Sequence, residues 1–143
     1  MKNAVFIACC ILGVVLAGCS KPREYLTRKP NAEEFSGDWR SSDVIPGSTG
    51  EIGIKIAPAK SCEVSALPIY DQDARGYKVF SGSGQWMINV AIPRKNGYLL
   101  VVMPNTTRLS AALEIMTLDG EMVLQYSPDP ETPQRAIFRK IRK

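Results

Sequence analysis

From about residue 35 onward, apolar and polar residues alternate with a period of two, and turn-forming residues recur every 8–12 positions. Ile52, Ile54 and Ile56, for example, alternate with less apolar neighbours, a pattern typical of a β-strand with one buried face. No window of ten residues carries a helical stripe. The pattern predicts strands over 37–42, 51–57, 62–68, 77–81, 85–93, 98–103, 111–118, 122–127 and 135–141.

Short turns join most of these predicted strands. Asp119-Gly120 lies between two apolar runs and predicts a hairpin with a type I′ turn, which needs positive φ at both central positions. Gly82-Ser83-Gly84 and Lys95-Asn96-Gly97 predict two further turns. We therefore expect an all-β fold, a small antiparallel meander of about eight strands. It would close into an up-and-down β-barrel, which removes exposed strand edges, with a β-sandwich as the alternative.

The first 18 residues have a different pattern. Fourteen of them are apolar, Lys2 precedes the run, and Ala4–Leu16 is interrupted only by Gly13. This order is typical of a cleaved secretory signal peptide. The run is too short for a stable membrane-spanning helix, which needs about 20 apolar residues. We expect a signal peptide over 1–18, a lipidated cysteine and flexible tether over 19–34, and a β-barrel-like domain over 35–143.

Leu16-Ala17-Gly18-Cys19 resembles the lipobox of bacterial lipoproteins at all four positions. The resemblance implies cleavage between Gly18 and Cys19, a diacylglycerol thioether on Cys19 and acylation of its new amino group. Two or more acyl chains anchor a protein to the bilayer stably. In the lipoprotein pattern Ser20 favours the outer membrane, facing the periplasm, if the host has two membranes. We expect no cofactor besides this covalent lipid.

The tether has a polar sequence with two prolines and no sustained periodicity. Ser20 to Pro30 would reach about 35–40 Å if fully extended, and its basic residues would contact anionic lipid or simply be solvated. After cleavage and lipidation only Cys62 remains as a free thiol. We expect Cys62 to be buried as a small apolar residue, the alternative being a reactive or intermolecular thiol.

Gly37-Asp38-Trp39 resembles the Gly-x-Trp opening of lipocalin-like (calycin) barrels. The resemblance implies that Trp39 closes one end of the barrel and packs near a basic residue late in the chain, Arg135 or Arg139. The alternative is that Trp39 is ordinary strand core.

Little in the composition points to catalysis. The chain has no histidine, which removes the usual general base and the commonest metal ligand. Asp71–Gly76 begins like a calcium loop but lacks its fifth and twelfth ligands. We interpret it as a polar turn in which Asp71 caps backbone groups and Gly76 takes positive φ. The acidic pairs Glu33/Glu34 and Asp129/Glu131 suit solvated loops. We expect no enzyme activity and no metal site.

Basic residues are concentrated at the C-terminal end of the sequence. The net charge is +4, or +3 once Lys2 is removed, and five of the last nine residues are basic. This pattern suits a charged edge strand or an anionic partner, and we expect no nucleic acid in an exported protein. The candidate interaction residues are Tyr70, Arg139, Lys140 and Arg142. We expect a membrane-anchored envelope lipoprotein that binds another envelope protein, with an apolar ligand inside the barrel as the alternative.

Overall fold

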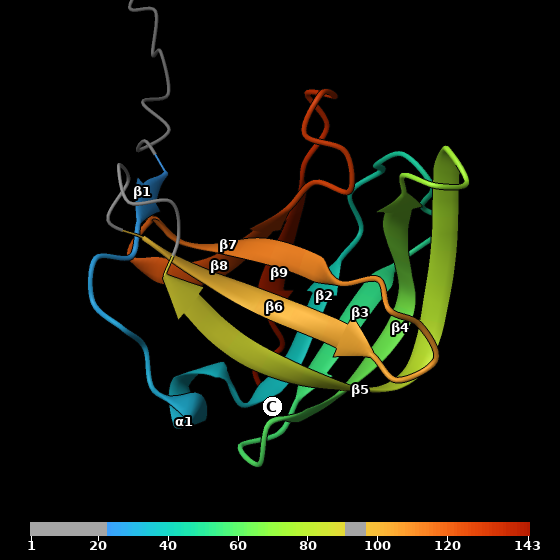
Figure 1. Ribbon diagram of the computed structural model, residues 1–143. Coiled ribbons are helices and arrows are strands. Elements are labelled where there is room, and N and C mark those ends of the chain that lie inside the picture. Colours follow the sequence, from blue (N-terminus) through green and yellow to red (C-terminus); the bar gives the residue numbers. More distant parts are fainter. Residues whose placement is uncertain (1–22, 91–96) are drawn as a thin grey trace, which may run out of the picture.

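The computed structural model describes residues 23–90 and 97–143 of the chain, and nearly all regular structure in these ranges is β-strand (Figure 1). Eight strands follow one another along the chain: β2 (Gly37–Ser41), β3 (Ile52–Ile56), β4 (Ser61–Asp71), β5 (Gly76–Val90), β6 (Tyr98–Pro104), β7 (Ala111–Leu118), β8 (Glu121–Tyr126) and β9 (Ala136–Lys140). The predicted strands agree with these except around β5, and a ninth strand, β1 (Glu24–Tyr25), was not predicted.

Each of the eight strands pairs antiparallel with the next, and β9 returns to pair with β2. The closing pairs place Trp39 opposite Lys140 and Arg40 opposite Arg139. This arrangement is a closed up-and-down barrel, so the barrel prediction is confirmed and the sandwich alternative is not. Because every strand has a neighbour on both sides, the barrel itself leaves no long unpaired edge.

The barrel interior holds one continuous apolar cluster. Alternate residues of the strands point inward, as the period of two requires, and most are fully buried. The largest fully buried side chains of the strands are Trp39, Phe138, Ile52, Ile54, Leu67, Leu100, Leu113, Ile115 and Leu124, and Phe35 joins them from outside the strands. Cys62 belongs to the same cluster and is 6% exposed, so its predicted burial is confirmed.

A short helix, α1 (Ala32–Phe35), covers one end of the barrel. Asn31 and Glu34 form a capping box at its start, which satisfies backbone N–H groups that a helix leaves unpaired. Phe35 packs against Trp39 and Trp86, with ring centroids 6.5 and 6.0 Å apart. Trp39 Nε1 donates to the Phe35 carbonyl at 2.8 Å, which fixes α1 over the core.

We call this the closed end of the barrel. Besides α1 it carries the turns at 57–60 and 119–120 and the final residues 141–143, because the strands that flank these segments start or finish here. The opposite end carries the loops at 42–51, 72–75, 105–110 and 127–135.

Residues 23–34, predicted as part of a flexible tether, lie against the barrel in the structure. Glu24 and Tyr25 form β1, which pairs with Thr117 and Met116 of β7. β1 lies beside the part of β7 that extends past β6, whose pairing with β7 starts at Leu99 opposite Glu114. Arg28 and Glu34 form an ion pair, which lowers the pKa of Glu34 to about 2. The sequence of β1 is too short to show any periodicity.

The turn predicted at Gly82-Ser83-Gly84 is wrong, because β5 runs through it as a single bent strand of 15 residues. Gly82 has φ of +125°, and a bulge in β4 between Val64 and Leu67 lies opposite. At Gly84 an added Cβ would lie 2.6 Å from the Met103 carbonyl oxygen. These glycines therefore permit a bend and a close approach to β6, rather than a chain reversal.

The hairpin turn at Asp119-Gly120 is confirmed, with φ of +53° and +80°. The Asp71–Gly76 segment is also a turn, in which Asp71 Oδ1 accepts hydrogen bonds from the backbone of Asp73 and Ala74. The positive φ in it, +50°, belongs to Arg75, so its placement at Gly76 was wrong. Of the predicted turn Lys95-Asn96-Gly97, residues 95 and 96 lie outside the described residues.

Candidate functional site

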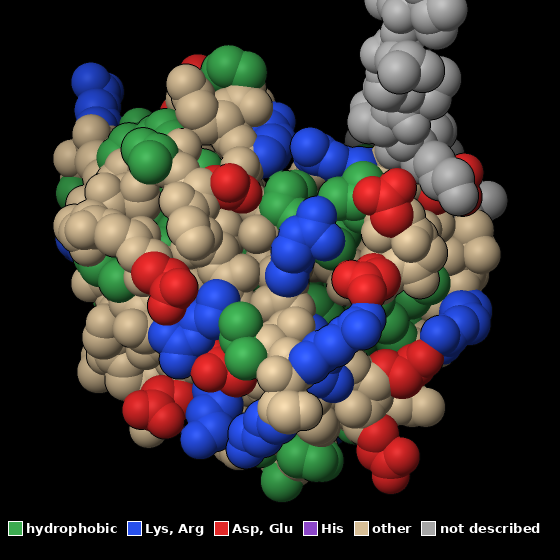
Figure 2. Space-filling view, turned by 180° about the vertical axis from the view of Figure 1, so that it is seen from behind, with side chains coloured by type: hydrophobic (Ala, Val, Ile, Leu, Met, Phe, Trp, Pro, Cys, Tyr) green, Lys and Arg blue, Asp and Glu red, His purple; other side chains and the backbone are tan. Residues whose placement is uncertain are grey.

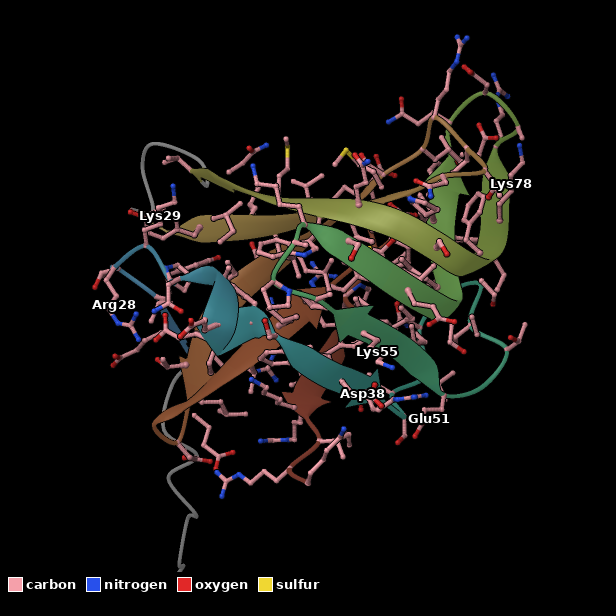
Figure 3. The ribbon with its side chains drawn as sticks, turned by 90° about the horizontal axis from the view of Figure 1, so that it is seen from below. Arg28, Lys29, Asp38, Glu51, Lys55 and Lys78 are labelled. Carbon is pink, nitrogen blue, oxygen red and sulfur yellow. The ribbon has the colours of Figure 1, made fainter. Side chains whose placement is uncertain are left out.

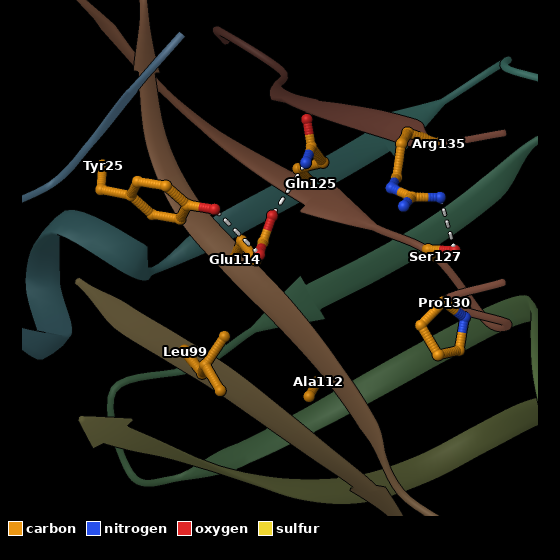
Figure 4. Close-up of a pocket in the computed structure, with 8 residues that line it drawn as sticks. All are labelled: Tyr25, Leu99, Ala112, Glu114, Gln125, Ser127, Pro130 and Arg135. Carbon is orange, nitrogen blue, oxygen red and sulfur yellow. Dashed lines mark hydrogen bonds between the residues drawn. The ribbon is translucent and has the colours of Figure 1, made fainter. Parts of the chain in front are cut away.

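A groove of about 360 Å³ crosses the outer surface of the barrel between β1 and the β8–β9 connection (Figure 4). Its floor is formed by outward-facing residues of β6, β7 and β8, with Tyr25 at one end and the 127–135 loop at the other. The lining residues are Tyr25, Leu99, Ala112, Glu114, Gln125, Ser127, Pro130 and Arg135. The groove therefore combines an aromatic ring, aliphatic side chains and charges of both signs.

Glu114 lies at the centre of a chain of hydrogen bonds in the groove. The Tyr25 hydroxyl donates to Glu114 Oε1 at 3.2 Å, and Gln125 Nε2 donates to Glu114 Oε2 at 2.8 Å (Figure 4). Arg23 Nη1 in turn donates to Gln125 Oε1 at 2.6 Å. These hydrogen bonds hold residues 23–25 against β7 and β8. They also fix the orientation of the Glu114 carboxylate in the absence of a partner.

Arg135 holds the other end of the groove. Its Nη1 donates to Ser127 Oγ and to the Gln134 carbonyl, both at 2.9 Å, and also to the Thr132 carbonyl. Arg135 therefore ties the 127–135 loop together, and it is not the basic residue that packs near Trp39. Tyr and Arg are the residue types that most often dominate binding energy at protein interfaces.

Strand register brings these residues together. Leu99 is opposite Glu114, and Glu114 is opposite Gln125, so the three side chains form one row on the outer face. Tyr25 joins the row only because β1 docks on β7, about 90 residues later in the chain. Sequence reasoning missed this groove, since nothing local in 23–25 indicates a strand.

The candidate interaction residues are spread over the surface. Tyr70 is half-buried, packs at a tilt against Tyr77 with ring centroids 5.2 Å apart, and lines a second hollow of about 330 Å³ near the opposite end. The basic candidates follow β9 toward the closed end, so the structure does not bring Tyr70 together with them.

Each of the three basic candidates has a different environment. Lys140 Nζ lies 6.0 Å from the Trp39 ring centroid and donates to the Glu34 carbonyl. Lys140 is thus the late basic residue near Trp39, and the expectation of Arg135 or Arg139 was wrong. Arg142 forms an ion pair with Glu121. Arg139 is exposed and lines a hollow of about 350 Å³ with Arg23 and Arg40.

The back of the barrel carries acidic and basic side chains interspersed, without one large field of a single sign (Figure 2). Arg40, for example, contacts Asp38 at 2.8 Å and Glu51 at 3.3 Å. Such mixed surfaces suit solubility more than attraction of a strongly charged ligand.

Three buried side chains, Cys62, Tyr126 and Asp71, have shifted pKa values. Burial raises the pKa of the Cys62 thiol to about 11. The Tyr126 hydroxyl is buried and donates to the Pro68 carbonyl at 2.6 Å, and burial raises its pKa as well. The ion pair with Lys78, together with backbone hydrogen bonds, lowers the pKa of Asp71. Within residues 23–90 and 97–143 no group of three potential ligands is placed to hold a metal ion.

Gly18 and Cys19, the predicted cleavage and lipidation residues, lie outside the described residues. Among the residues that are described, no helix has the length and apolar character needed to cross a membrane. Comparisons of the chain with protein-family models, with curated proteins and with solved structures find no match.

Proposed function

We propose that this chain is a lipid-anchored protein of the bacterial cell envelope whose barrel binds a partner protein through the outer groove. The role is binding, with no catalytic step. The anchor is the lipid on Cys19, in the outer membrane and facing the periplasm where the host has two membranes. The lipobox Leu16-Ala17-Gly18-Cys19 directly behind an apolar run supports the anchor.

The observation that carries the binding proposal is the contrast between the interior and the outer surface. Large side chains from around the barrel fill the interior as one apolar cluster. The outer groove, by contrast, presents Tyr25, Leu99, Glu114 and Arg135 around the exposed Ala112. A pre-oriented carboxylate, an aromatic ring and a fixed guanidinium are features of a protein interface that offers both apolar and charged anchors.

The fold is compatible with a lipocalin-like barrel, and Trp39 beside Lys140 at the closed end supports that relationship. Carriage of an apolar ligand would need an inner cavity of roughly 300 Å³ or more. Five surface hollows formed by described residues are lined by residues other than the central core residues Leu100, Leu113 and Phe138. The proposal is therefore binding at the outer surface.

Photo-crosslinking in intact cells tests this proposal. A photoreactive amino acid at Ala112 lies in the groove, and one at Lys55 on β3 is the matched control, because both positions are exposed and face outward. In the order of the eight strands, β3 is four positions from β7 and therefore lies across the barrel. We expect a discrete protein adduct from position 112 and at least a five-fold weaker one from position 55.

The adduct should also be lost in the Arg135→Ala variant, whose loop no longer holds its shape. Equal adducts from both positions, or none from position 112 in protein that is confirmed to be folded and membrane-bound, would contradict binding through the groove.

A further inference from the structure

We propose that the closed end of the barrel faces the membrane and that its basic side chains contact anionic lipid headgroups. This inference rests on the lipid anchor at Cys19 proposed above. It adds an orientation of the barrel and a second binding surface to that proposal.

Only a short length of chain connects the anchor to the barrel. Arg23 is bonded to Gln125 at 2.6 Å, and Glu24 pairs with Thr117, so the chain is attached to the barrel from residue 23 onward. Cys19 precedes Arg23 by four residues, and four residues span at most about 14 Å. β1 lies beside the end of β7 that leads into Asp119-Gly120 at the closed end. The anchor therefore holds this end of the barrel close to the lipid headgroups.

Charge is distributed unequally between the two ends of the barrel. The closed-end segments by themselves are neutral, and with the attached residues 23–31 and the adjoining strand residues Glu121 and Lys140 their net side-chain charge is +2. Those at the opposite end, 42–51, 71–78, 105–110 and 127–135, have a net side-chain charge of −2. Figure 3 shows Arg28 and Lys29 beside α1 and Lys78 at the far side of the molecule. A negatively charged leaflet attracts the first set and repels the second within about a Debye length.

The last residues, 140–143, combine an exposed aliphatic side chain with basic side chains. Ile141 N donates to the Asp38 carbonyl at 2.8 Å, so this segment is attached to β2. Ile141 is nevertheless 50% exposed, and it lies between the cations Lys140, Arg142 and Lys143. An exposed aliphatic side chain flanked by basic residues matches the interfacial region of a bilayer, where apolar groups enter and cations meet phosphates.

Quenching of single fluorescent labels on the full lipoprotein tests the orientation. Ala59 lies in the closed-end turn at 57–60 and Ala74 in the opposite-end turn at 72–75, and both are exposed. Because alanine and cysteine are both uncharged at neutral pH, Ala59→Cys and Ala74→Cys leave the charge of each end unchanged. Cys62 is buried, so the introduced thiol reacts first. Each labelled lipoprotein is reconstituted into vesicles of phosphatidylglycerol and phosphatidylethanolamine that contain a headgroup-attached quencher.

We expect quenching at position 59 to be at least three-fold stronger than at position 74. We also expect the ratio to fall by about half in vesicles of phosphatidylcholine alone, because the charge preference is removed while the short connection remains. Equal or reversed quenching would overturn the orientation, and a ratio that is the same in both lipids would overturn the headgroup contact. If instead the wild-type protein carries no acyl chain and does not float with the vesicles, the anchor proposal itself has failed.

Discussion

Tyr126 shows how much one buried hydroxyl contributes to this barrel. The residue is 2% exposed, and its hydroxyl links β8 to the Pro68 carbonyl of β4 across the core. We expect Tyr126→Phe to lower the free energy of unfolding by about 1–2 kcal/mol, because a buried carbonyl loses its donor. Urea denaturation followed by fluorescence measures this loss.

Tyr70→Phe is the matched control for this change. The Tyr70 hydroxyl makes no hydrogen bond within the described part of the chain, and its ring contact with Tyr77 would be kept. We expect its effect to stay within about 0.5 kcal/mol. Equal losses in the two variants would show that the Tyr126 hydrogen bond adds nothing.

The burial of the Cys62 thiol makes the stability of the barrel depend on pH. The folded-state pKa is raised to about 11, so the unfolded chain releases its thiol proton first as pH rises. Between about pH 9 and 11 the unfolded state binds fewer protons, and stability therefore falls with rising pH, by at most about 2–3 kcal/mol. Below pH 8 the thiol contributes no pH dependence.

We expect the stability difference between wild type and Cys62→Ala to shrink over pH 9–11 and to be constant at pH 6–8. Denaturation at a series of pH values checks this. A difference that is independent of pH up to 11 would contradict a protonated, desolvated thiol.

Single-residue environments were the least predictable part of the chain. The burial of Cys62 follows from its place in an alternating strand. The partner of Trp39 depends on the register in which β9 closes against β2, which places Lys140 opposite it. Nothing in the spacing of Arg135, Arg139 and Lys140 specifies that register.

At the scale of the elements, glycines have two distinct roles that the sequence pattern alone does not separate. Gly120 has open space around it and φ of +80°, whereas Gly84 approaches the backbone of β6. We expect Gly120→Ala to cost about 1 kcal/mol of stability, through backbone conformation alone. We expect Gly84→Ala to cost about 3 kcal/mol, because β5 and β6 must separate.

Urea denaturation compares the two glycine variants, and amide hydrogen exchange should locate the damage of Gly84→Ala in β5 and β6. A Gly84→Ala variant as stable as Gly120→Ala would show that β5 and β6 can move apart at little cost, and would contradict the expected difference. The same distinction explains the wrong turn at 82–84: a Gly-Ser-Gly sequence suits a bend inside a long strand as well as a reversal, and only pairing with β4 and β6 decides between them.

For the whole molecule, the alternation of apolar residues was enough to predict an all-β barrel. Closure followed from eight strands in sequence order. The docking of β1 could not be predicted, because two residues form a strand only when β7 extends past β6 and offers unpaired backbone groups. The outer groove depends on this docking, and so was missed with it.

The eight-stranded barrel closes without β1, and this has a testable consequence. We expect a chain that begins at residue 31 to keep α1, the β-dominated circular dichroism spectrum and a cooperative unfolding transition. Its stability should fall by about 1–2 kcal/mol relative to a chain that begins at residue 23, since β1, with the hydrogen bonds of Arg23 and Tyr25, is lost. A shorter chain that is unfolded would show that β1 is required for the fold.

The location of the protein in the envelope and the membrane-facing end of the barrel both depend on the lipid at Cys19, so this modification is the central claim. Metabolic labelling with radioactive palmitate, followed by separation of membranes, measures it directly for wild type and Cys19→Ala. We predict a labelled, membrane-bound wild-type protein and an unlabelled Cys19→Ala variant that is released from the membrane. A Cys19→Ala variant that keeps both the label and the membrane association would contradict the account.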